Sequence, residues 1–166
     1  LNYNAAYGAL PSVSRTGYTF ASWNTKADGT GTTVTSSTKM GAANTTIYAI
    51  WTINSYTLTA NANNGSIAST SGWTGTGTTA TKTLNYNAAY GALPSVSRTG
   101  YTLKGWFTAS SGGTEVTTTT KIGAADTTIY AQWNINSYVL TANANSGTIA
   151  TTSGWSGTGT TATKSL

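Results

Sequence analysis

Few side chains in this sequence could take part in catalysis. The chain has three acids, Asp28, Glu115 and Asp126, and neither histidine nor cysteine. Glu115 and Asp126 fall in one copy of an internal repeat, where the sister copy has Thr33 and Asn44. A general acid–base pair needs two titratable groups, and a calcium site needs several carboxylate or carbonyl oxygens. The sequence therefore predicts no enzyme, no catalytic residue, no metal site and no cofactor.

Two tryptophans are the best candidates for contact with a ligand. Trp73 and Trp155 each lie in the pattern S-G-W-[TS]-G-T-G-T-T-A-T-K, among small and polar residues. An aromatic ring in such a loop can stack on a sugar, or it can pack against its own unit or the next one. We favour packing against a unit, and contact with a glycan is the alternative.

The sequence repeats itself almost without change. The string from Leu1 to Thr19 recurs at Leu84–Thr102, and later landmarks such as Trp51 and Trp133 keep nearly the same spacing. One extra residue falls in the first copy, between Asn24 and Thr33. Such close copies indicate a repeat architecture, in which each unit contacts its neighbours.

Composition favours an extracellular structural protein. Charged residues are 7% of the chain, and the net charge of +5 comes from basic residues that are never adjacent. Nucleic-acid binding needs clustered cations, so none is expected. No apolar run approaches the roughly 20 residues of a membrane span. A Thr/Ser/Gly/Asn-rich chain without cysteine is typical of a secreted or cell-surface bacterial protein. Because Leu1 falls inside a repeat, we expect a piece of a longer chain.

Alternating apolar and polar residues predict β-structure. Strands are expected over Thr45–Trp51, Ser55–Ala60 and Thr79–Tyr86, and another from Gly17 to Trp23. Tyr18 and Phe20 share one face of that last strand, and Trp23 breaks the alternation, which indicates a bulge. The fold class is therefore mainly β, with small units in an elongated array and little helix.

Turn and helix signals are sparse. Asn64-Gly65 indicates a hairpin turn, and Ser146-Gly147 replaces it in the next copy. The best helix candidates, which are weak, are the short segments Ala5–Leu10 and Ala88–Leu93.

The repeat frame divides the chain into three parts. Strands end near Trp51 and Trp133, and new strands begin at Tyr56 and Tyr138. Residues 1–52 are then the back part of a unit, residues 53–134 a complete unit, and residues 135–166 the front part of a following unit. Because half units would expose strand edges, we expect neighbouring repeats or other copies of the chain to complete them.

Six aromatic residues are expected to form the cores of these units. Each ends, starts or interrupts a predicted strand that also carries inward aliphatic residues; they are Trp23, Trp51, Trp106, Trp133, Tyr18 and Tyr101.

The chain resembles the Listeria–Bacteroides repeat, also called the internalin B-repeat. The resemblance rests on Gly17–Trp23 with Thr46–Trp51, and on their copies Gly100–Thr108, Gly112–Thr117 and Thr128–Trp133. It implies a small β-grasp-like unit strung in tandem on bacterial surface proteins. Spacer, adhesion or receptor-contact roles follow from it, without enzymatic activity. Ser22 and Asn24, where the family has Gly and an aromatic residue, depart from the pattern.

The function that we expect is a structural segment of an extracellular bacterial fibre, stalk or adhesin. Its partners would be neighbouring repeats or further copies of itself. The alternative is an adhesin module that binds host or surface glycans or receptors through Trp73 and Trp155.

Overall fold

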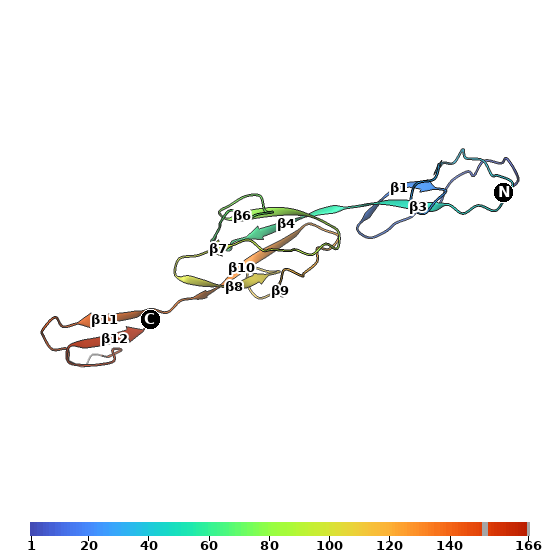
Figure 1. Ribbon diagram of the computed structural model, residues 1–166. Helices are drawn as coiled ribbons and strands as arrows, with labels where there is room; N and C mark the ends of the chain where they lie inside the picture. The colour runs from blue at the N-terminus through green and yellow to red at the C-terminus, as the bar shows by residue number, and fades with distance from the viewer. Residues whose placement is uncertain (151–152, 166) are drawn as a thin grey trace.

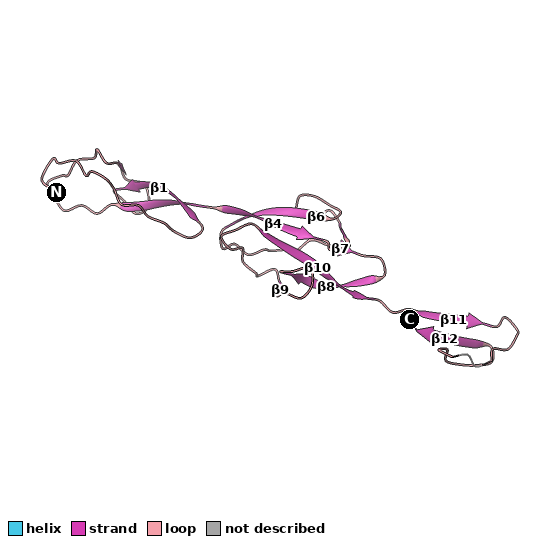
Figure 2. Ribbon diagram, turned by 180° about the vertical axis from the view of Figure 1, so that it is seen from behind, coloured by secondary structure: helices cyan, strands magenta, loops and turns pink. Residues whose placement is uncertain are grey.

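The computed structural model describes residues 1–150 and 153–165, and this part of the chain contains strands, turns and loops but no helix. The strands form three groups that follow one another along a line, with the N-terminus at one end and β11 and β12 at the other (Figure 1). The view from behind shows the same order (Figure 2). The first group holds β1 (Tyr18–Asn24), β2 (Thr33–Val34) and β3 (Tyr48–Ile53); the middle group holds β4 (Ser55–Asn61), β5 (Ser66–Ile67), β6 (Thr79–Asn85), β7 (Val96–Ser97), β8 (Tyr101–Phe107), β9 (Glu115–Val116) and β10 (Thr127–Ile135); the last hairpin holds β11 (Val139–Asn143) and β12 (Thr161–Ser165).

The middle group is built on a five-stranded sheet in the order β6-β4-β10-β8-β9. Its first strand, β4, pairs in parallel with its last long strand, β10, over Leu58–Asn61 and Thr127–Tyr130. The other pairs in this sheet are antiparallel. A small second sheet joins β5 to β7. β4, from the front part of the repeat unit, and β10, from its back part, therefore lie side by side in the centre of this sheet.

The core of the middle group combines residues from both sides of that central pair. Leu58 on β4 and Ile129 on β10 are both 0% exposed. Burying such a side chain contributes about 1.5–3 kcal/mol. The whole cluster is Leu58, Ala60, Ala62, Ile67, Ala80, Tyr90, Trp106, Val116, Ile122, Ile129 and Ala131.

The first group has only the back part of this arrangement. Its sheet has the order β2-β1-β3. The bulge predicted near Trp23 is confirmed, because the register of β1 against β3 shifts between Phe20 and Ser22. The strand predicted over Thr45–Trp51 begins only at Tyr48, so the expected start is wrong. Its counterpart β10 begins earlier because it has β4 as a partner there, and the first group has no such strand.

The last hairpin has only the front part. β11 and β12 pair in antiparallel register from Val139 opposite Ser165 to Asn143 opposite Thr161. This is the register of β4 and β6 in the middle group.

Two local predictions are corrected by the structure. The helix candidates Ala5–Leu10 and Ala88–Leu93 are not helical; Ala6 and Ala89 instead form bridges to later loops. The turn before Gly65 is present, with Asn63 and Asn64 both at positive φ. However, β5 after this turn pairs with β7, and β4 pairs with β6, so it does not close a simple hairpin.

Candidate functional site: the joints and the open edge

One residue, Asn54, forms the joint between the first and middle groups. Its backbone N–H donates to the Gly17 carbonyl at 2.9 Å, and its own carbonyl accepts from the Tyr86 N–H at 2.8 Å. Its side-chain Oδ1 accepts from the Thr19 hydroxyl at 2.6 Å. Because Asn54 bonds to both groups at once, the joint restrains their relative orientation.

Aromatic packing supports the same joint. The Tyr86 ring of the middle group lies edge-on to Tyr18 of the first group, with 6.0 Å between ring centroids. Gly17 has a φ of +78°, and any side chain there would overlap the Tyr86 ring, so glycine permits this close approach. The Arg15 guanidinium covers Tyr18 at 3.8 Å from the ring centroid.

The second joint, between the middle group and the last hairpin, repeats the contacts of the asparagine with the glycine and the threonine, and the contact of the arginine with the tyrosine. The Asn136 N–H donates to the Gly100 carbonyl at 3.0 Å. The Thr102 hydroxyl donates to Asn136 Oδ1 at 2.7 Å. Arg98 covers Tyr101 at 3.7 Å. No described ring covers Gly100 as Tyr86 covers Gly17.

Side-chain hydrogen bonds tie the front and back parts of the middle group together. Trp133 Nε1 donates to the carbonyls of Ala62 and Asn63 at 3.1 and 3.0 Å. Asn63 Nδ2 donates in return to the carbonyls of Ala131 and Ser110, each at 2.9 Å. These bonds cross from the loop after β4 to β10 and to the loop after β8.

Trp73 makes a similar cross-link. Its Nε1 donates to the Ala92 carbonyl at 2.9 Å, and the half-buried ring packs on the core cluster. The Lys82 ammonium lies 5.9 Å from the ring centroid and donates to the Tyr90 carbonyl at 2.9 Å. The loop tryptophan therefore packs on its own unit and holds the segment before Pro94.

The three acids lie apart, each with a local role. Asp126 Oδ1 accepts from the Thr57 N–H at 2.7 Å and so joins β4 to the turn before β10. Asp28 accepts from the N–H and hydroxyl of Thr30, which lower the pKa of its carboxyl below the ordinary value of 3.8. Glu115 lies beside Gly105. In the described residues, no group of three acids could hold a metal ion.

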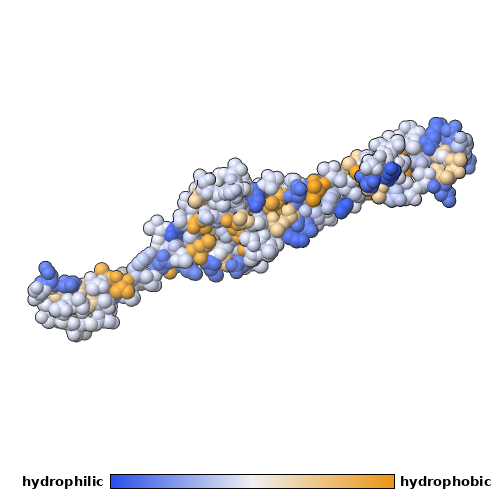
Figure 3. Space-filling view, viewed as in Figure 1, coloured by the Kyte–Doolittle hydropathy of each residue, from blue (hydrophilic) through white to orange (hydrophobic). Residues whose placement is uncertain are grey.

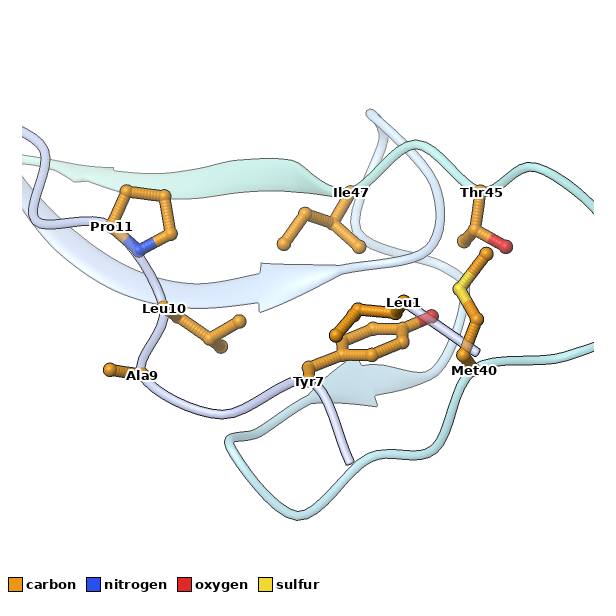
Figure 4. A pocket seen from close by; sticks show the side chains of 8 residues that line it. All are labelled: Leu1, Tyr7, Ala9, Leu10, Pro11, Met40, Thr45 and Ile47. Carbon is orange, nitrogen blue, oxygen red and sulfur yellow. The ribbon is translucent and has the colours of Figure 1, made fainter. Parts of the chain in front are cut away.

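The first group is open where the middle group has β4. A hollow of about 250 Å³ lies there, with mainly apolar side chains pointing into it (Figure 4). Its lining is Leu1, Tyr7, Ala9, Leu10, Pro11, Met40, Thr45 and Ile47. The matching residues of the middle group include Tyr90, Ile122 and Ile129, which are buried.

The last hairpin exposes the side chains that match the buried side chains of β4. Leu140, which matches Leu58, is 53% exposed, and Tyr138 is 64% exposed. Ile135 and Val139 are also exposed, and Figure 3 shows an apolar area where the chain enters β11. Trp155, the match of Trp73, is half-exposed in its loop.

The aromatic residues expected in cores lie in different surroundings. Trp106 is buried in the middle group, and Trp133 packs on the same cluster. Trp23 and Trp51 are half-buried, each with its ring centroid 5.8 Å from that of Phe20. Tyr18 and Tyr101 are half-buried at the joints, each with an arginine over its ring.

Sequence reasoning missed the joint asparagines and Asn63. The signal for Asn54 and Asn136 was present, because both copies read I-N-S-Y at the change of strand.

The model of one protein family matches this chain. The Listeria-Bacteroides repeat domain matches residues 1–50 and 56–132. No solved structure matches the chain. No helix among the described residues is long and apolar enough to cross a membrane.

Two curated bacterial proteins are similar to it. A putative Gly-rich membrane protein of Evansella cellulosilytica is 34% identical over 146 residues, which cover 81% of this chain and 16% of that protein. Internalin H of Listeria monocytogenes is 32% identical over 124 residues, 74% of this chain and 20% of that protein. The match thus spans a fifth or less of each relative.

Proposed function

Because this chain belongs to the Listeria-Bacteroides repeat domain family, we propose that it is a structural segment of an extracellular bacterial stalk, fibre or adhesin. Its role is to hold units at fixed spacing and orientation outside the cell, without catalysis. The names of the relatives, an internalin and a membrane protein, support a place at the bacterial surface.

The observation that carries this proposal is the joint at Asn54. A spacer must keep its units apart and must limit bending between them. A single linking residue leaves no slack, and its bonds to Gly17, Thr19 and Tyr86 engage both groups. The repetition of the Asn136 contacts at the second joint supports one geometric rule for successive units.

The proposal divides the chain into one complete unit, residues 53–134, between two partial ones, residues 1–52 and 135–166. The cross-links of Trp73, Trp133 and Asn63 support this division, because each joins the front part of the middle unit to its back part. A unit of this kind is built for packing rather than for chemistry.

Single-molecule energy transfer tests the stiffness of the joint. The chain has no cysteine, so the exposed Ala42 and Ser111 can be changed to cysteine as the only dye sites, one on each side of Asn54. We expect a single narrow distribution of transfer efficiency. Asn54→Ala removes the side-chain bond to Thr19 and should broaden it, whereas the exposed Asn134→Ala should not.

A broad distribution in the unmodified chain, equal to that of Asn54→Ala, would contradict a stiff spacer.

Protease treatment of intact cells that make the full protein tests whether this segment lies at the cell surface. Cleavage of this segment without lysis supports surface exposure, and protection until lysis refutes it.

A further inference from the structure

We propose that the middle group bears tension along the chain, and that the parallel pair of β4 and β10 is the clamp that resists stretching. The proposal rests on the proposed structural function and adds the load that the segment carries and the place where this load is resisted. It concerns the middle group alone, which has a joint at each end.

Tension along the chain enters and leaves the middle group through these two strands. β4 begins at Ser55, directly after the joint residue Asn54, and β10 ends at Ile135, directly before Asn136. The two joints lie at opposite ends of this group (Figure 1). Because β4 and β10 run in parallel, a pull at both joints draws the start of β4 and the end of β10 in opposite directions along the strands.

This direction of pull loads the pair in shear. The paired segments are Leu58–Asn61 and Thr127–Tyr130, and the hydrogen bonds of a parallel pair are evenly spaced along the strands. All of these bonds therefore share the load, whereas a pull across the strands breaks them one after another. Among the described strands, the order β6-β4-β10-β8-β9 makes this pair the only contact within the sheet between the front and back parts of the unit.

Side-chain hydrogen bonds reinforce the pair beyond both of its ends. Asp126 Oδ1 accepts from the Thr57 N–H at 2.7 Å, just before the paired segments begin. Just after they end, Asn63 Nδ2 donates to the carbonyls of Ala131 and Ser110, each at 2.9 Å. Sliding of β4 along β10 must break these bonds together with those of the backbone.

Apolar side chains fix the register of the pair. Leu58 on β4 and Ile129 on β10 are both 0% exposed and belong to the same core cluster. A shift of a strand by one residue turns its buried side chains to the opposite face of the sheet. Sliding therefore costs the burial of these two side chains as well as the hydrogen bonds.

Single-molecule force measurements on the full chain, with two pulling directions, test the proposal. The chain has no cysteine, so Thr52→Cys and Ser137→Cys, both at exposed positions, attach handles just outside the two joints and load the pair in shear. A second form combines Thr52→Cys with Ala125→Cys, at an exposed position next to the start of β10, so that the same pair is peeled open from one end. We expect a rupture force at least about twofold higher in the first form, because several evenly spaced bonds break together in shear and singly in peeling.

Two amide side chains provide matched variants for the shear form. Asn63→Gly removes an amide that bonds the front part to the back part, and glycine accepts the positive φ of 47° at this position. Gln132→Ala removes an amide that also donates to two carbonyls, those of Ala109 and Gly112, but all of these residues lie in the back part. Both variants should lower the free energy of unfolding in urea, and only Asn63→Gly should lower the rupture force.

Equal rupture forces in the two pulling directions would overturn the proposal. So would an equal loss of force in Asn63→Gly and Gln132→Ala, because the bonds between the front and back parts would then have no mechanical role of their own. Melting at the temperature of the unmodified chain shows that both handle forms fold. A stiff joint measured by energy transfer, together with equal rupture forces, would leave the spacer function standing and remove only the clamp.

Discussion

Leu58 and Leu140 provide a direct test of the proposed division of the chain into one complete unit and two partial ones. They are the same residue at the same position of the repeat, on β4 and β11. Leu58 is 0% exposed and Leu140 is 53% exposed. Truncation of each to alanine therefore removes the same atoms from opposite environments.

The structure sets the magnitude of each effect. A leucine-to-alanine change in a closed core costs about 2–5 kcal/mol, through lost burial and the cavity left behind. For a unit of about 60–100 residues, each kcal/mol lost from the free energy of unfolding lowers Tm by about 4 °C or more. Leu58→Ala should therefore lower the Tm of the middle group by roughly 10 °C or more. Leu140→Ala removes a half-exposed group and should stay within about 0.5 kcal/mol.

Urea and thermal unfolding, followed by tryptophan fluorescence, measure both changes. The samples are kept at a concentration where light scattering gives the mass of one chain, so that both variants are compared as single chains. Equal destabilisation by the two variants would refute the assignment of a closed middle unit beside an open hairpin.

Three further predictions concern contacts inside the units. Trp133→Phe keeps an aromatic ring but loses the indole N–H bonded to the carbonyls of Ala62 and Asn63. Urea unfolding should show a loss of about 1–3 kcal/mol, because the Asn63 carbonyl loses this donor, whereas the Ala62 carbonyl still accepts from the Gly65 N–H. Asp126→Ala removes the acceptor for the Thr57 N–H and should cost about 1 kcal/mol, whereas Asp126→Asn should cost less in the same assay. The hydrogen bonds from Thr30 lower the pKa of Asp28 in the folded protein. The ionised carboxylate therefore stabilises the fold above the unfolded pKa, and this stabilisation is lost as the pH falls through the folded pKa. Carboxyl NMR titration should give a midpoint below 3.8, and a midpoint at or above this value would contradict the hydrogen bonds.

Local patterns in the sequence were enough to predict β1, β4 and β6, and the bulge in β1. Alternation placed Leu58 and Ala60 inward on β4, where both are buried. The break of parity at Trp23 predicted the register shift between Phe20 and Ser22. These features depend on neighbouring residues, so a single sequence carries them.

The start of β3 could not be predicted in this way. Residues 45–47 have the same strand pattern as residues 127–129, yet only the latter are in a strand. The difference is the presence of β4 beside β10. A strand edge needs a partner, and no local pattern shows whether that partner is there.

The position of the joint was predicted, because one strand was expected to end near Trp51 and the next to begin at Tyr56, but its contacts were not. The string I-N-S-Y in both copies marks Asn54 without showing which residues it bonds to. The role of Asn54 depends on Gly17 and Tyr86, which lie more than thirty residues away on either side. Only the folded arrangement brings these three residues together.

The most direct test of the account is the width of the transfer-efficiency distribution between dyes at positions 42 and 111, measured for the unmodified chain and for Asn54→Ala. The account predicts a narrow distribution for the unmodified chain and a broader one for Asn54→Ala, because Asn54 bonds to both groups. A distribution that is already broad in the unmodified chain and that Asn54→Ala leaves unchanged would contradict it.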